Sequence, residues 1–134
     1  MAMECLHPTP AKGCALLYDE IESLSRRVAN KTFQRGLWKT GETPEGNVDT
    51  RAWANVLDQL SDKLDFHSCR ASCPDLSRNL IAQIRGITGP RNESGHKPKR
   101  KSDLIKRDRR LRTRFESAAD LLLDLSDAAK PLRV

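Results

Sequence analysis

An arginine and a histidine, Arg91 and His96, stand five residues apart in a polar segment, and Asn92 directly follows the arginine. A guanidinium carries forked N–H donors that can hold phosphoryl oxygens and stabilise charge on them. An imidazole titrates near neutral pH and can therefore transfer a proton. Together, these residue types are suited to chemistry on a phosphate ester.

The residues that follow form a strongly cationic stretch from Lys97 to Arg114, which we call the basic segment. It holds ten lysines or arginines and two aspartates, a net charge of +8, whereas the whole chain carries +6. The remaining residues, fourteen basic and sixteen acidic, carry −2. Cations this dense repel one another unless counter-ions neutralise them, which favours contact with the phosphates of RNA. The predicted RNA contacts are Lys97, Lys99, Arg100, Lys101, Lys106, Arg107, Arg109, Arg110, Arg112 and Arg114.

The motif of Arg91, Asn92 and His96 resembles the R-x-x-x-x-H signature of the HEPN family, whose members are small all-helical bundles with the signature late in the chain. The resemblance implies that Arg91 and His96 are the catalytic pair of a metal-independent RNA endonuclease of the toxin or defence type. Asn92 would occupy the polar position beside the arginine. The resemblance also implies a homodimer in which both motifs face a shared cleft, with no cofactor. In such a site, the histidine would remove the proton of a 2′-hydroxyl and the arginine would stabilise the charge on the phosphoryl group.

Two other classes of function stay open. One is a non-catalytic RNA-binding protein, such as a viral silencing suppressor or a nucleoprotein-like factor, that uses the basic segment alone. The other is a helical adaptor whose last helix pairs with another helix. With two Trp, one Tyr and three Phe, the chain is poor in rings on which bases could stack. Duplex RNA can be gripped by shape and phosphate contacts alone, so RNA binding does not require such rings.

Cysteine spacing and hydropathy constrain the remaining possibilities. The four cysteines, Cys5, Cys14, Cys69 and Cys73, lack the close C-x-x-C pairs of structural zinc sites, which predicts unpaired thiols and no metal. No apolar run is long enough to span a bilayer, and the N-terminus lacks the pattern of a signal peptide. We therefore expect no membrane association and no secretion. The predicted location is the cytoplasm, or the nucleus because of the KPKRK run at 97–101.

The apolar residues repeat at helical spacing along most of the chain. The expected fold is an all-α, four-helix bundle-like single domain over 14–130, with a loose N-terminal lead-in over 1–13. A glycine-rich loop is expected over 34–48, and a basic loop before the last long helix, where Gly95 and Pro98 flank His96. Asp49 or Thr50 is expected to cap the second helix, and Pro74 with Asp75 to open the third. The predicted helices are 14–33, 50–66, 75–88 and 103–129.

Overall fold

The computed structural model describes residues 10–88 and 101–134, with side chains described for 15–88, 113 and 115–134. This part of the chain is helical and contains no strand, which confirms the predicted all-α, bundle-like fold. Five α-helices and a short 3-10 helix follow one another in it. Their bounds are α1 Pro10–Gln34, α2 Trp53–Lys63, α3 Phe66–Ser72, α4 Arg78–Gly86, α5 Lys101–Ala129 and η3 Lys130–Leu132.

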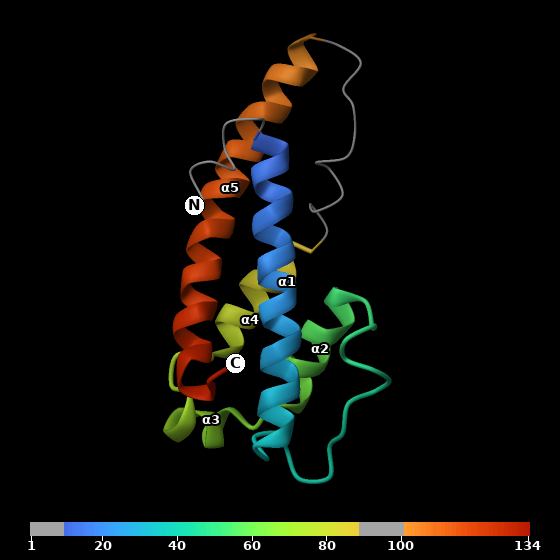
Figure 1. Ribbon diagram of the computed structural model, residues 1–134, viewed down its shortest axis with the longest axis vertical. Coiled ribbons are helices and arrows are strands. Elements are labelled where there is room, and N and C mark those ends of the chain that lie inside the picture. The colour runs from blue at the N-terminus through green and yellow to red at the C-terminus, as the bar shows by residue number, and fades with distance from the viewer. Residues whose placement is uncertain (1–9, 89–100) are drawn as a thin grey trace.

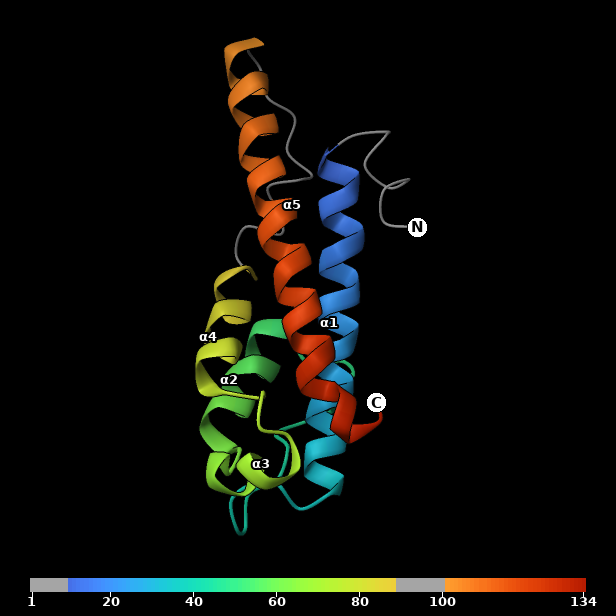
Figure 2. The same cartoon turned by 90° about the vertical axis from the view of Figure 1, so that its left-hand side faces the viewer.

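The two longest helices, α1 and α5, lie side by side and share the most extensive contact between any two elements described (Figures 1 and 2). The shorter helices α2 and α4 pack on each other and cover one end of this pair, and α3 lies at the far tip of that end. The start of α5, in orange, extends past the start of α1, in blue, at the opposite end of the molecule (Figures 1 and 2).

The core lies where the apolar stripes of these helices meet. In α1, Ile21, Leu24 and Val28 are buried, as their spacing predicts. In α5, Leu121 and Leu125 are buried. Removing each such side chain from water contributes about 1.5–3 kcal/mol, and the core therefore holds the second half of α5 against α1.

The second predicted helix is in fact two helices. The backbone is extended at Leu64, which ends α2 at Lys63. Asp65 then caps α3, because its carboxylate accepts hydrogen bonds from the backbone N–H groups of His67 at 3.1 Å and Ser68 at 3.3 Å. The prediction of one helix over 50–66 was wrong because Asp65 acts as a cap and not as a residue of the helix interior.

Two other helix starts differ from those expected. The N-cap of α2 is Ala52, without a side-chain hydrogen bond, while Asp49 instead accepts a hydrogen bond from Asn30 at 2.9 Å. Helix α4 begins at Arg78, not at Pro74 or Asp75, because the hydroxyl of Ser77 accepts the backbone N–H of Leu80 at 3.1 Å. Residues 74 and 75 form a turn before this cap.

Helix α1 begins at Pro10, earlier than the predicted start at Cys14. A proline is compatible with the first turn of a helix, because the N–H that it lacks would have no partner there. Residues 10–13 of the predicted lead-in are therefore helical, and residues 1–9 lie outside the described part of the chain.

The long loop between α1 and α2 is held at both ends by hydrogen bonds. The Arg26 guanidinium donates to the carbonyl oxygens of Val48 at 2.8 Å and Arg51 at 2.6 Å. The Trp38 indole N–H donates to the hydroxyl of Thr32 at 2.9 Å. These bonds tie both ends of the loop to α1.

Candidate nucleic-acid interface

Helix α5 carries opposite charges in its two halves. Residues 101–114 hold seven lysines or arginines and two aspartates, whereas residues 115–129 hold four acidic residues and no basic one. Cations, not anions, stabilise the C-terminal turn of a helix through its dipole, yet the last turn of α5 contains Asp127 and no basic residue. Helix stability therefore does not account for this order of charges.

The structure places seven of the predicted RNA contacts on one continuous helix. Their backbone lies in the first half of α5, and the start of this half extends past the start of α1 (Figure 1). At about 1.5 Å per residue, residues 101–114 span about 21 Å. These seven residues are Lys101, Lys106, Arg107, Arg109, Arg110, Arg112 and Arg114.

The rest of the predicted site lies outside the described residues. This group includes the motif residues Arg91, Asn92 and His96. It also includes the first three cations of the basic segment, Lys97, Lys99 and Arg100. The motif, its catalytic pair and the loop that carries it therefore stay predictions.

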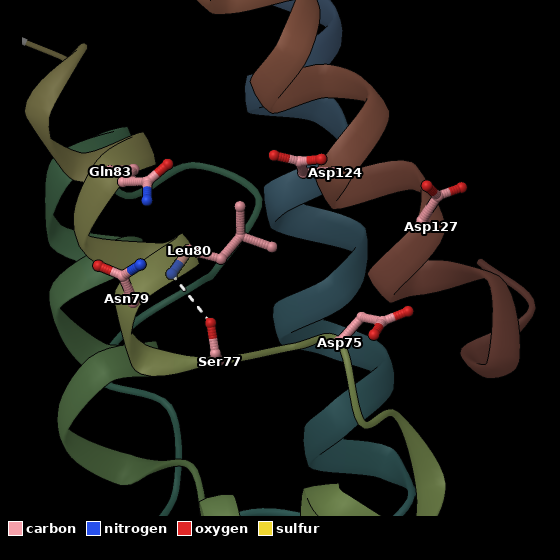
Figure 3. Close-up of a pocket in the computed structure, with 7 residues that line it drawn as sticks. All are labelled: Asp75, Ser77, Asn79, Leu80, Gln83, Asp124 and Asp127. Carbon is pink, nitrogen blue, oxygen red and sulfur yellow. Dashed lines mark hydrogen bonds between the residues drawn. The ribbon is translucent and has the colours of Figure 1, made fainter.

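An acidic pocket lies at the other end of α5, between its second half and the start of α4 (Figure 3). It has a volume of about 400 Å³. Asp124 and Asp127 contribute carboxylates from α5, and Asp75 contributes one from the turn before α4 (Figure 3). The other lining residues in the described part of the chain are Ser77, Asn79, Leu80 and Gln83, none of which is a cation.

The two ends of α5 therefore differ in charge. The three carboxylates of the acidic pocket repel a phosphate backbone, whereas the basic half of α5 attracts it. Sequence analysis missed this pocket because Asp75 is distant in sequence from Asp124 and Asp127.

The described cysteines, Cys69 and Cys73, are buried free thiols. Burial, with a smaller contribution from the neighbouring Cys73, raises the pKa of the Cys69 thiol to about 12. Burial also raises the pKa of Cys73, against the opposing effects of its hydrogen bond with Cys69 and of the Arg35 charge. Both are therefore protonated at neutral pH and poorly reactive. Cys5 and the side chain of Cys14 lie outside the described part of the structure.

The residues with described side chains contain no group of three or more His, Cys, Asp or Glu arranged to hold a metal ion. Among the described helices, none is long and apolar enough to cross a membrane. Comparison of the chain with protein families, with curated proteins and with solved structures finds no match.

Proposed function

We propose that this protein binds RNA through the basic segment, with the first half of α5 as the main contact. The observation that carries the proposal is the concentration of +8 charge in Lys97–Arg114 on a chain that otherwise carries −2. Most of that charge lies on a continuous helix that extends past the start of α1 (Figure 2). The proposed place of RNA binding is the cytoplasm or the nucleus.

The binding mode follows from the charge and from the scarcity of aromatic residues. Lysine and arginine side chains that neutralise phosphates release condensed cations, which drives association at low salt. A single helix of about 21 Å can follow a phosphate backbone without reading the bases. Duplex RNA, which is recognised largely by shape and backbone contacts, is therefore the preferred form.

The test compares two quadruple variants with the same change in charge. Lys99, Arg100, Lys101 and Arg107 are replaced with Ala in the binding variant. In the control, alanine replaces four exposed cations outside the basic segment: Arg27, Lys39, Lys130 and Arg133. We expect the binding variant to lose most of its affinity for a labelled RNA duplex at low salt, and the control to lose little. Equal losses would mean that net charge, and not the basic segment, determines binding.

A second candidate function is RNA cleavage by the HEPN-like motif. The observation that favours it is the position of Arg91, Asn92 and His96 immediately before the basic segment, in a small helical chain. The motif is adjacent in sequence to the basic segment. RNA held on that segment would therefore be near the arginine and histidine that cleavage requires. A homodimer would bring a second histidine, so that one could act as base and the other as acid.

Two single variants test the second candidate. Arg91→Ala and His96→Ala should each abolish cleavage while RNA binding changes far less, because both groups act mainly on the transition state. Cleavage should persist in a metal chelator and leave a 2′,3′-cyclic phosphate, since the RNA's own hydroxyl is the attacking group. If the purified wild type leaves a broad panel of RNAs intact, the enzyme hypothesis is rejected and RNA binding alone is kept. If it binds no RNA either, the helical adaptor becomes the favoured function.

A further inference from the structure

A second pocket, of about 380 Å³, lies between α3 and the start of α4. Helix α3, which forms one side of it, lies at the end of the molecule opposite the start of α5 (Figures 1 and 2). Its volume is within the range of small-molecule sites, roughly 300–1,000 Å³. The lining residues are Phe66, Arg70, Pro74, Leu76, Ser77 and Arg78.

Two arginines of this pocket have donors that the protein does not use. In the described part of the chain, neither Arg70 nor Arg78 forms an ion pair or a side-chain hydrogen bond. Arg26 and Arg85, in contrast, are each bound to a carboxylate. The N–H groups of the two pocket arginines are therefore available to an anion.

The ring of Phe66 holds one of these arginines in place. The guanidinium carbon of Arg78 lies 5.0 Å from the centroid of the Phe66 ring. Such a cation–π contact uses none of the N–H donors of the guanidinium in a hydrogen bond, so they stay available to a ligand. Arg78 is thus oriented before any ligand arrives, which lowers the entropy that binding must overcome.

The rest of the lining is apolar or neutral. Phe66, Pro74 and Leu76 form an apolar wall, and the Ser77 hydroxyl is already bonded to the N–H of Leu80. Among the described residues, no carboxylate lines this pocket, and Asp75 lines the acidic pocket instead. The ligand that fits is therefore an anion with an apolar, flat portion.

We propose that this pocket binds a phosphate monoester that carries a flat ring. The phosphate binds the guanidinium groups of Arg70 and Arg78, and the ring packs against the wall formed by Phe66 and Pro74. A forked guanidinium matches two phosphate oxygens at once, which a lysine ammonium cannot do. This site is separate from the basic segment and does not depend on RNA binding.

The test uses the full chain and phenyl phosphate as the probe, with binding followed by NMR shifts of the backbone amides. Wild type should bind phenyl phosphate, with shifts centred on α3 and the start of α4, and should bind inorganic phosphate and phenol at least about tenfold more weakly. Adenosine monophosphate and O-phosphotyrosine are then compared, to identify whether the natural ring is a nucleobase or a phenol.

Matched variants separate the pocket from general charge. Arg78→Lys keeps the charge but loses the fork and the flat face, and should weaken phenyl phosphate binding about tenfold. Arg85→Lys, a change on the same helix outside the pocket, should bind like wild type, and so should the quadruple variant of the basic segment. Phe66→Leu should weaken binding while the NMR spectrum stays that of a folded chain. The proposal is overturned if wild type does not bind the probe, or if Arg78→Lys and Arg85→Lys bind it equally well.

Discussion

Replacing Arg26 with Ala should destabilise the fold more than replacing Arg27, the other arginine of α1, with Ala. Its guanidinium, whose side chain is 16% exposed, donates to the carbonyl oxygens of Val48 and Arg51 and pairs with Glu22 at 2.8 Å. A hydrogen bond from a charged donor contributes about 1.5 kcal/mol when part-buried, as for Val48, and about half of that when exposed, as for Arg51. The pair with Glu22, four residues away on the same helix, adds about 0.4 kcal/mol. The expected loss is therefore about 2.5 kcal/mol in the free energy of unfolding.

Urea unfolding followed by circular dichroism measures this loss. The neighbouring Arg27 provides the control, because it is exposed and its side chain makes one long hydrogen bond, of 3.4 Å, to Ser23. Arg27→Ala should change the free energy of unfolding by no more than about 0.5 kcal/mol. If the two variants unfold at the same urea concentration, the bonds from Arg26 to the loop do not hold it in place.

Three further predictions concern thiol reactivity, core packing and pH. Alkylation of Cys69 and Cys73 in the native protein at pH 8 should be slow and should become fast in denaturant, since burial keeps both pKa values raised; rapid native labelling at these positions would contradict this account. Leu125→Ala should cost about 2–5 kcal/mol because Leu125 is 2% exposed, whereas Leu123→Ala, at a position 64% exposed, should cost little in the same unfolding assay. Hydrogen bonds at the start of α3 lower the pKa of Asp65 in the folded state. The stabilisation that the ionised Asp65 gives is therefore present above its unfolded pKa and is lost as the pH falls through its folded pKa. In Asp65→Asn, the free energy of unfolding should therefore fall less steeply as the pH is lowered. If it falls as steeply as in wild type, the ionised Asp65 does not act as a cap.

The fold was largely predictable because it depends on apolar spacing. Ile21, Val28 and Leu125 recur at helical intervals, and burying them decides which faces of α1 and α5 meet. The error at α2 and α3 has a local cause. Whether Asp65 continues a helix or caps a new one depends on the extended backbone of Leu64, which spacing alone does not reveal.

The sites were less predictable, and for a different reason. The basic segment is contiguous, so its charge can be counted directly from Lys97 to Arg114. The pocket of Phe66 and Arg78 combines two helices, and the first of them, α3, was not predicted. The cation–π contact between these two residues exists only once the chain has folded. The acidic pocket likewise requires Asp75 to be brought to α5 by tertiary packing.

The salt dependence of duplex RNA binding tests most directly the claim that the basic segment binds phosphate. The affinity is measured by fluorescence anisotropy over a series of salt concentrations, for wild type and for both quadruple variants. Each phosphate contact contributes about 0.9 to the slope of log affinity against log salt, so losing Lys99, Arg100, Lys101 and Arg107 should reduce the slope by about 3 to 4. The control variant, altered at Arg27, Lys39, Lys130 and Arg133, should keep the wild-type slope. If the basic-segment variant keeps the wild-type slope instead, its cations do not contact phosphate and the proposed function is wrong.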